Sequence, residues 1–573
     1  MLSCESAVSG KYDAIEREIS SMNPLKRAVL IYLRWGIRGI AGWGRALLRK
    51  RQEASSYQRV LDGEGSARPR NFEAFDGPRL SVLLPVYNVD EIWLRKCIDS
   101  VLDQTYANWE LCIVDDASTA VHIRPILKEY ASTDTRIKVL FRETNGHISA
   151  ASNSSLRMAS GEFCILLDHD DELSTDALFW VANEMLEHPD VAMIYSDEDL
   201  IDANGKRSDP KFKPDFSRDL FYSLNLVTHL SAYRTSILKA IGGFRVGLEG
   251  SQDYDLALRV VERINENQLR HIPRILYHWR AIPGSVALDG GEKPYAHERA
   301  RKALREHFER IGVDARVEKT HFDLHRIRYE LPDPIPKISA ISWSDTIQAS
   351  SKIDAANTYD GRGEVELITV EAQTDLAPTL NDWAAKATGD VLVFLRSGLE
   401  SISEMPLVEL VSYALQEDIG CVGGIVFGKN GTVEGGGLVL GGKGIANVAH
   451  AGLPEHMPGH LVRNLVTSNF SAVGLEVFAI RKQTLQECGG FDVNLRNTDL
   501  LAADLCLRVG KTGKRIVLTP YAKYRFNGFN SSKTRVVSAK ERDSFRSKWS
   551  CIVSRDPFSN PNVKSDGSFS III

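Results

Sequence analysis

The amino-acid sequence predicts an α/β protein whose core is a doubly wound, mostly parallel β-sheet, and it predicts that this plan occurs twice along the chain. Two observations support this prediction. From residue 79 onward, short apolar runs alternate with segments of helical periodicity, and beyond residue 334 pieces of the same stretch recur in the same order. Short apolar runs are typical of strands buried on both faces of a parallel sheet. Helices between such strands supply the crossover connections that cover both faces.

Acidic residues follow two of the four strands expected in the first half of the chain. Asp115 and Asp116 come after one strand, and Asp168 and Asp170 come after another. In doubly wound sheets, ligands bind in the crevice outside the carboxyl ends of the strands. The two acidic groups are therefore expected to share one crevice. The expected strands are 80–85, 109–114, 137–141 and 163–167, and the expected helices are 92–103, 123–131 and 149–160.

A second, weaker cycle begins after Pro334. Three short pieces of the first half recur in it in the same order, which indicates an internal duplication. The second cycle has expected strands at 337–342, 365–370 and 391–395 and an expected helix at 380–387. The recurring pieces are Gly161–Leu167 with Gly389–Leu395, Ile241–Phe244 with Cys488–Phe491, and Asp255–Arg259 with Asp504–Arg508.

These patterns divide the chain into residues 1–78, 79–333 and 334–573. The first part carries a basic amphipathic helix at 23–51, followed by a polar, glycine-containing linker. Its arginines fall on one side of the helix and its apolar residues on the other, a pattern typical of a helix that lies on an anionic membrane surface. The alternative is a helix that packs on its own catalytic domain with solvated arginines. The arginines are Arg27, Arg34, Arg38, Arg45 and Arg49.

Composition narrows the class of protein. In a chain of 573 residues, 43% hydrophobic and 25% charged residues are values of a soluble globular protein. A net charge of -5 argues against a dedicated nucleic-acid binder. The eight scattered cysteines favour buried thiols in a reducing compartment. Neither a signal peptide nor an apolar stretch of about 18 residues is evident, so a cytoplasmic location is expected.

The acidic run Asp168–Asp171 suggests a metal site. Carboxylates this close repel one another in an empty site, and a divalent cation relieves the repulsion. Oxygen ligands without thiolates suit Mg²⁺ or Mn²⁺. The alternative is a solvated turn or a helix cap.

Asp253 stands at the start of an expected helix that covers residues 256–262. The helix dipole keeps a carboxylate ionised there, and an ionised carboxylate beside a substrate hydroxyl can act as a general base. Plain capping of the helix explains the residue equally well. The sequence leaves both interpretations open.

A series of short motifs gives residues 80–330 a resemblance to a known family. In this order over some 200 residues, the series resembles the family 2 glycosyltransferases of bacterial surface-polysaccharide synthesis (O-antigen or rhamnan type), which have the GT-A fold. The motifs are Ser81–Asn88, Gln104–Tyr106, Val114–Ser118, Asn145–Gly146, Ala151–Asn153, Leu167–Leu173, Tyr195–Asp199, Phe212–Pro214, Gln252–Asp255 and Leu276–Arg280.

The resemblance implies a role for eight residues. It implies an enzyme that inverts the anomeric carbon in one displacement, with a nucleotide-sugar donor and a glycan acceptor on a lipid carrier at the inner face of the cytoplasmic membrane. It assigns donor binding to Pro85, Tyr87, Asp116 and Asn153, metal binding to Asp168, Asp170 and His278, and the general base to Asp253.

The second cycle departs from the family pattern. Arg396–Gly398 stand where the acidic motif is expected, and Ala502–Ala503 stand where the base is expected. Residues from about 335 to 555 therefore resemble a degenerate transferase domain. Its glycine-rich stretch Glu434–Lys443 is expected either to line a sugar-binding groove or to be purely structural.

Two other classes of protein share part of this pattern. A nucleotidyltransferase has a similar sheet, but it usually carries a glycine-rich basic loop after the first strand, and Val86–Val89 is not one. A non-catalytic glycan-binding or scaffold protein suits the second cycle better than the first, whose acidic set is complete.

Overall fold

The computed structural model describes residues 52, 54–62, 77–282, 294–344, 364–370, 376–526 and 537–572. Contacts between Cα atoms divide the chain into two compact units. We call residues 54–216 and 225–313 the N-terminal unit, and residues 217–224 and 314–572 the C-terminal unit. The C-terminal unit thus includes a short segment from within the sequence of the N-terminal unit. The predicted basic helix at 23–51 lies outside the described residues.

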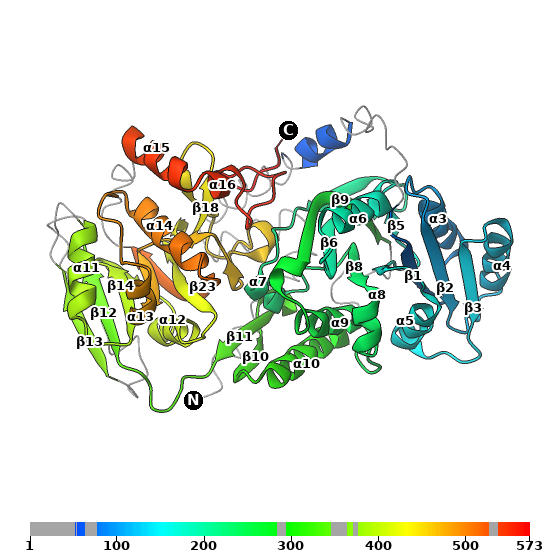
Figure 1. Ribbon diagram of the computed structural model, residues 1–573, viewed down its shortest axis with the longest axis horizontal. Helices are drawn as coiled ribbons and strands as arrows, with labels where there is room; N and C mark the ends of the chain where they lie inside the picture. Colours follow the sequence, from blue (N-terminus) through cyan, green and yellow to red (C-terminus); the bar gives the residue numbers. More distant parts are fainter. Residues whose placement is uncertain are drawn as a thin grey trace, which may run out of the picture. The chain divides into compact units, whose positions relative to one another are not determined.

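The N-terminal unit is built on one large sheet, in the order β3-β2-β1-β4-β8-β6-β9-β5 with β7 on β6 (Figure 1). Strands β3, β2, β1 and β4 are parallel, as predicted. Strand β8 runs antiparallel to both β4 and β6, so the sheet as a whole is mixed. The strands are β1 Leu80–Val86, β2 Trp109–Asp115, β3 Ile137–Phe141, β4 Phe163–Leu166, β5 Glu172–Leu173, β6 Met193–Asp202, β7 Arg207–Lys211, β8 Ser231–Arg234 and β9 Leu269–Ala281.

Helices fill the connections of this sheet. In α3 the apolar residues Leu94, Cys97, Ile98 and Val101 recur at helical spacing and are buried. They join the β1–β4 strands in one apolar core. The predicted linker also contains a helix, at 54–62. The remaining helices are α3 Glu91–Leu102, α4 Ile123–Thr133, α5 His147–Met158, α6 Ala177–Glu187, α8 Thr235–Ala240, α9 Gln252–Val261, η1 Glu266–Gln268 and α10 Pro294–Ile311.

The C-terminal unit repeats the plan of this sheet. Its order is β13-β12-β14-β22-β16-β23-β15, with β17 on β16. Strands β13, β12 and β14 are parallel, β22 is antiparallel to both β14 and β16, and β16 is parallel to β23. The strands of this sheet are β12 Ile338–Trp343, β13 Val365–Thr369, β14 Val391–Arg396, β15 Leu399–Ser401, β16 Ile419–Phe427, β17 Val433–Gly435, β20 Ser468–Asn469, β22 Val477–Arg481 and β23 Arg515–Phe526.

Smaller sheets and helices complete the C-terminal unit. Strands β10 and β11 form a hairpin, and β19, β18 and β21 form a three-stranded sheet. Their bounds are β10 Ala315–Lys319, β11 His325–Tyr329, β18 Gly437–Gly441, β19 Ile445–Val448 and β21 Ala472–Val473. The helices are α7 Arg218–Ser223, η2 His321–Asp323, α11 Leu376–Lys386, α12 Pro406–Ala414, η4 His460–Val462, α13 Lys482–Glu487, α14 Thr498–Gly510, α15 Ala539–Lys548 and α16 Ser550–Ser554.

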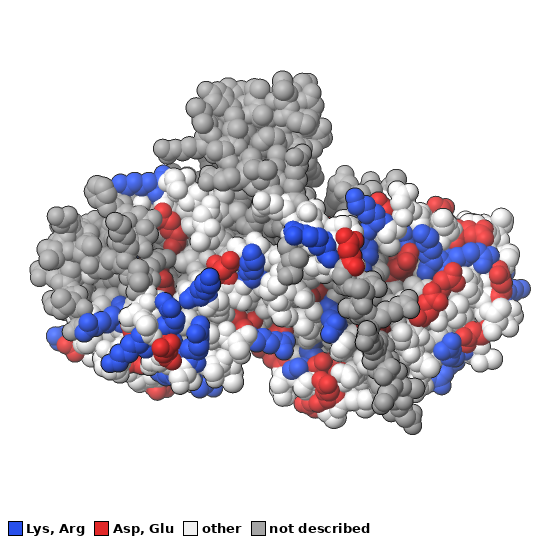
Figure 2. All heavy atoms as spheres, turned by 90° about the horizontal axis from the view of Figure 1, so that it is seen from above, with Lys and Arg blue, Asp and Glu red and all other residues white. Residues whose placement is uncertain are grey.

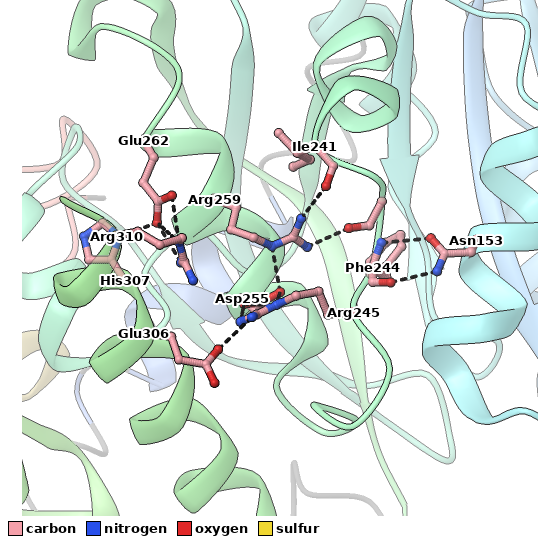
Figure 3. A network of polar contacts seen from close by, with 11 residues as sticks. Asn153, Ile241, Phe244, Arg245, Asp255, Arg259, Glu262, Glu306, His307 and Arg310 are labelled. Atoms are coloured by element: carbon pink, nitrogen blue, oxygen red, sulfur yellow. Dashed lines mark hydrogen bonds and ion pairs between the residues drawn. The ribbon is translucent and has the colours of Figure 1, made fainter.

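An arginine makes the same set of contacts in both units, and it is buried in the N-terminal unit and partly buried in the C-terminal unit. In the N-terminal unit, Arg259 donates to the Asp255 carboxylate at 2.9 Å and to the carbonyls of Ile241 and Gly243 at 3.0 and 2.6 Å (Figure 3). In the C-terminal unit, Arg508 donates to Asp504 at 2.8 Å and to the carbonyls of Cys488 and Gly490. These are the pieces that recur in the sequence. The repeated contacts, together with the shared strand order, support the predicted duplication.

Positive and negative side chains are mixed on the surface of the described residues (Figure 2), and most of the described cysteines lie in the interior. On the face in Figure 2, Lys and Arg side chains are interspersed with Asp and Glu side chains. Five of the seven described cysteines are buried. Among the described residues, no helix combines the length and the apolar character needed to cross a membrane.

Candidate active site

The loops after β1 and β2 are joined at the carboxyl edge of the N-terminal sheet. The side-chain oxygen of Asn88 accepts from the backbone amides of Thr119 at 2.9 Å and Ala120 at 3.0 Å. The loop after β4 reaches the same edge, where Nδ1 of His169 lies 3.2 Å from the carbonyl oxygen of Pro85. The loops that carry the two acidic groups therefore meet where three parallel strands end, the edge at which ligands bind in doubly wound sheets.

The predicted donor-binding residues differ in exposure and in the contacts that their side chains make within the protein. Pro85 is buried in β1, whereas Tyr87 directly after β1 is 43% exposed. The Asp116 carboxylate is buried and accepts from the Gly146 amide at 3.1 Å, and it forms an ion pair with Arg142 at 2.8 Å. An exposed aromatic ring is available for stacking, while Asp116 is fixed in place by its own neighbours.

Asn153 holds a turn of the N-terminal unit. Its amide nitrogen donates to the carbonyl of Phe244 at 2.7 Å, and its amide oxygen accepts from the Phe244 amide at 2.8 Å (Figure 3). Asn381 makes the same two bonds to Phe491 in the C-terminal unit, at 2.9 and 2.8 Å. These paired bonds give Asn153 a structural role, and its predicted contact with the donor stays a prediction.

Three side chains near the end of β4 could hold a cation together. Asp168, Asp171 and His229 each offer one ligand atom, and these atoms lie within 4.8 Å of one another. Asp171 is almost fully buried, and its carboxylate accepts from the Tyr277 hydroxyl at 2.6 Å and the Arg280 amide at 2.7 Å. Burial, followed by the charges of Asp170 and Asp168, raises the pKa of Asp171 well above its usual range.

His229 was not predicted as a site residue. Its ring stacks on Tyr277 with centroids 4.6 Å apart, and its Nδ1 lies 3.1 Å from the Glu198 carboxylate. Burial alone would lower the pKa of His229, but the hydrogen bond and charge of Glu198, with the charges of Asp171 and Asp168, raise it to about 9. No motif marks this histidine, because its partners come from β4, β6 and β9.

His278, a predicted metal ligand, lies outside that cluster of three and has an ordered partner of its own. Its Nδ1 lies 2.6 Å from Oδ1 of Asp199, and the other oxygen of Asp199 accepts from Arg207 at 2.6 Å and from the Tyr57 hydroxyl. A carboxylate on one ring nitrogen fixes the tautomer and orients the other nitrogen. This arrangement is typical of a metal-binding histidine. Tyr57 belongs to the helix at 54–62 within the predicted linker.

Asp170, the other predicted ligand, is half-buried beside the same cluster. Its charge contributes to the raised pKa of Asp171, and its backbone carbonyl accepts from Nε of Arg280 at 2.6 Å. The structure thus gathers Asp168, Asp170, Asp171 and His229 in one acidic neighbourhood. Oxygen ligands of this kind fit Mg²⁺ or Mn²⁺.

Asp253 lies in the first turn of α9, as predicted from the sequence. Its Oδ2 accepts from Nδ2 of Asn225 at 2.8 Å and is 3.4 Å from the Thr228 hydroxyl. Burial raises the pKa of Asp253, the charge of His229 lowers it, and the charge of Asp168 raises it. The candidate base is therefore in electrostatic reach of the candidate metal cluster.

Helix α9 is fixed by ion pairs to α10 and to the turn before it. Glu262 at its end pairs with His307 and Arg310, each at 2.7 Å, and Asp255 binds both Arg245 and Arg259 (Figure 3). Both oxygens of the fully buried Asp255 carboxylate thereby have cationic partners. Asp255 is a structural residue, while Asp253, two positions earlier, faces Asn225 and Thr228.

The C-terminal unit has other residues at the corresponding positions. Arg396 ends β14 and places its guanidinium 4.5 Å from the centre of the Phe526 ring. Ala502 and Ala503 are fully buried in α14. A cavity of about 450 Å³ lies elsewhere in this unit, lined among others by Glu434, Asp499 and Arg542. The predicted glycine-rich stretch thus contributes Glu434 to this cavity, which polar and apolar residues line together.

Comparison with known proteins identifies the class to which this site belongs. Residues 81–242 match the family model described as Glycosyl transferase family 2. The Escherichia coli protein WcaA, named as a colanic acid biosynthesis glycosyl transferase, is 30% identical over 199 residues, which are 33% of this chain and 69% of that protein. The chain belongs to glycosyltransferase family 2.

Two longer relatives extend over both units. The O-antigen biosynthesis protein RfbC of Myxococcus xanthus is 34% identical over 500 residues, which are 81% of this chain and 38% of RfbC. The uncharacterized protein y4gI of Sinorhizobium fredii is 34% identical over 563 residues, which are 91% of this chain and 60% of y4gI. The chain therefore spans less than two thirds of the length of either relative.

Among solved structures, the chain is similar to TarS of S. aureus in complex with UDP-GlcNAc, at 21% identity and a TM-score of 0.32 over 40% of this chain and 73% of that chain. It is also similar to the mannosyltransferase PcManGT of Pyrobaculum calidifontis in complex with GDP-Man and Mn²⁺. That match has 20% identity and a TM-score of 0.31 over 50% of this chain and 75% of that chain.

Proposed function

We propose that this chain is an inverting glycosyltransferase that moves a sugar from a nucleoside-diphosphate sugar to a hydroxyl group of a growing bacterial surface glycan. The observation that carries the proposal is the position of Asp253, a half-buried residue in the first turn of α9. Its carboxylate accepts a hydrogen bond from Asn225, and the charges of His229 and Asp168 influence its pKa. Membership in family 2 supports the reaction class. The names of RfbC and WcaA support a surface glycan as the product.

In the proposed reaction, Asp253 is the general base. The acceptor hydroxyl oxygen forms a bond to the anomeric carbon while the bond from that carbon to the diphosphate oxygen breaks. The hydroxyl proton passes to the Asp253 carboxylate. Burial raises the pKa of this carboxyl group, which makes its ionised form a stronger proton acceptor than an exposed aspartate.

The proposed donor site occupies the carboxyl edge of β1, β2 and β4. Tyr87 offers an exposed ring to the nucleoside, and Asp116 offers a fixed carboxylate to a base N–H. Asp168, Asp170 and His278 would hold Mg²⁺ or Mn²⁺, with Asp171 and His229 beside them. Burial, followed by the negative charges of Asp170 and Asp168, raises the pKa of Asp171, and a cation bound among these carboxylates would offset that repulsion. When bound, the cation neutralises charge on the departing diphosphate.

We further propose that the acceptor is carried on a lipid and that the chain acts at the inner face of the cytoplasmic membrane. The basic pattern at 23–51 supports this location, since juxtaposed arginines bind anionic lipid surfaces. In this proposal the C-terminal unit has no transferase site, because Arg396 and Ala502 replace the acidic residues that the reaction uses.

The function is tested by incubating the full chain with a panel of nucleotide sugars, Mg²⁺ or Mn²⁺ and lipid-linked or free glycan acceptors. A glycosyltransferase releases a nucleoside diphosphate and elongates the acceptor. A nucleotidyltransferase instead releases pyrophosphate or transfers a nucleoside monophosphate. A chain that binds glycans but releases no nucleotide from any donor is a scaffold, and this result would refute the proposal.

A further inference from the structure

We propose that the C-terminal unit serves the reaction by anchoring helix α7, and that Asn225, two residues beyond this helix, positions the carboxylate of Asp253. The inference rests on the proposed function, because it takes Asp253 as the base. The inference gives a function to the C-terminal unit, which has Arg396 and Ala502 where the N-terminal unit has its acidic residues. The segment Ser217–Leu224 belongs to the C-terminal unit although the residues before and after it belong to the N-terminal unit.

One buried asparagine fixes the start of α7. The side-chain oxygen of Asn469 in β20 accepts from the Asp219 amide at 2.9 Å and from the Ser217 hydroxyl at 3.1 Å. Its side-chain nitrogen donates to the Asp219 carboxylate at 2.6 Å, and its backbone amide donates to the Ser217 hydroxyl at 3.1 Å. All three residues are at most 3% exposed. Four hydrogen bonds among buried groups fix the position of this turn.

An ion pair at Asp219 and a hydrogen bond at Ser223 add to this anchor. Arg515 in β23 forms an ion pair with the Asp219 carboxylate, and its other nitrogen pairs with Asp418 at 2.9 Å. The hydroxyl of Ser223, the last residue of α7, donates to the Thr467 carbonyl at 3.1 Å. Since breaking a buried ion pair is costly, α7 is held at its start by β20 and β23 and at its end by Thr467, the residue before β20.

Asn225, which binds the proposed base Asp253, is only two residues beyond the end of α7. The amide of Leu224 still donates to the Leu220 carbonyl at 2.9 Å, and the next residue is Asn225. Nδ2 of Asn225 then donates to Oδ2 of Asp253 at 2.8 Å. Two residues can span only about 7 Å, so a shift of α7 must move Asn225.

Asn225 suits a positioning role rather than a chemical one. An amide side chain neither gains nor loses a proton at ordinary pH, so it cannot act as an acid or a base. Its N–H group donates a hydrogen bond to a carboxylate and cannot accept one. This bond fixes one oxygen of Asp253 and thus the rotamer of the base. Because a misplacement of about 1 Å can cost about 10²-fold in rate, the bond bears directly on kcat.

The test uses the full chain and compares Asn225→Ala and Asn469→Ala with the wild-type protein and with Asn381→Ala. Asn381 is a matched control, because it also makes two side-chain bonds, here partly buried, to a backbone segment of the C-terminal unit but lies outside the α7 anchor. We expect both test variants to lose about 10- to 100-fold in kcat while the donor KM changes less than about twofold. Asn381→Ala is expected to keep the wild-type kcat.

Two further variants keep the test decisive if Asn469→Ala does not fold. Ser223→Ala removes a single bond at the end of α7, and Ser217→Ala removes the hydroxyl that bonds Asn469 twice at its start. Each is expected to lower kcat by about three- to tenfold with an unchanged donor KM. A kcat within about twofold of wild type in Asn225→Ala would overturn the positioning role, and the same result in both serine variants would overturn the anchor. If the wild-type chain transfers no sugar, or if Asp253→Asn leaves turnover unchanged, it is the proposed function that fails.

Discussion

Arg259 is the buried centre of the network that holds α9, and replacing it with alanine is expected to destabilise the N-terminal unit. Arg259 is 8% exposed, and its guanidinium binds the Asp255 carboxylate and two backbone carbonyls of the preceding turn (Figure 3). The substitution removes all three bonds. It also leaves Asp255, which has no exposed surface, with only one of its two cationic partners.

The expected loss follows from these contacts. Removing one partner of a buried ion pair typically costs about 3–5 kcal/mol of unfolding free energy. Nε of Arg245 still donates to Asp255 at 3.0 Å, which reduces the cost of the remaining charge. We therefore expect Arg259→Ala to lose about 3 kcal/mol, at the lower end of that range. Arg508→Ala should lose a similar amount in the C-terminal unit, where Lys548 stays 2.7 Å from Asp504.

Hydrogen exchange of the α9 amides in the full chain measures this loss locally. Arg95→Ala is the control, since Arg95 pairs with the half-exposed carboxylates of Glu91 and Glu129, and such surface pairs contribute about 0–1 kcal/mol. A loss of protection for Arg259→Ala no larger than that for Arg95→Ala would refute the view that this network fixes α9.

Three further predictions concern the site and the membrane. Asp170→Asn should abolish metal-dependent donor binding without changing the thermal unfolding midpoint, whereas normal metal-dependent binding would remove Asp170 from the ligand set. Because burial raises the pKa of Asp253 and the base must be ionised, kcat should fall with decreasing pH at a midpoint above the value of about 3.9 for an exposed aspartate; a midpoint at or below that value would contradict this. Replacing the five arginines of the basic helix with Gln should release the chain from anionic vesicles, at about 1 kcal/mol per residue, and binding that ignores both the substitutions and added salt would contradict the membrane proposal. The arginines are Arg27, Arg34, Arg38, Arg45 and Arg49.

The first four strands and the helices between them were predictable because local physics determines them. Strand β3 has the predicted bounds, and β1, β2 and β4 differ from prediction by one residue at their ends. Parallel strands buried on both faces appear in sequence as uninterrupted apolar runs. The reversal at β8 was not predictable, because the four residues Ser231–Arg234 carry no sign of the strands between which they insert.

The site was predictable only where residues follow one another in sequence. Asp168, Asp170 and Asp253 stand in motifs, so a role could be predicted for each of them from the sequence, and these roles stay predictions. His229 and Asn225 acquire their partners through folding, and neither has a neighbour in sequence that indicates its role. The anchor of α7 was least accessible, because Asp219 meets Asn469 across 250 positions of the chain.

Sugar transfer by the wild-type chain and by Asp253→Asn tests the central claim most directly. The variant keeps the shape of the side chain but removes the proton acceptor. We expect wild-type protein with Mg²⁺ or Mn²⁺ to release nucleoside diphosphate from at least one nucleotide sugar and to elongate a glycan acceptor. The variant should bind the same donor with unchanged affinity and turn over about 10²–10⁴-fold more slowly. Equal turnover in the two proteins would contradict the account, and would leave Asp253 as a helix cap.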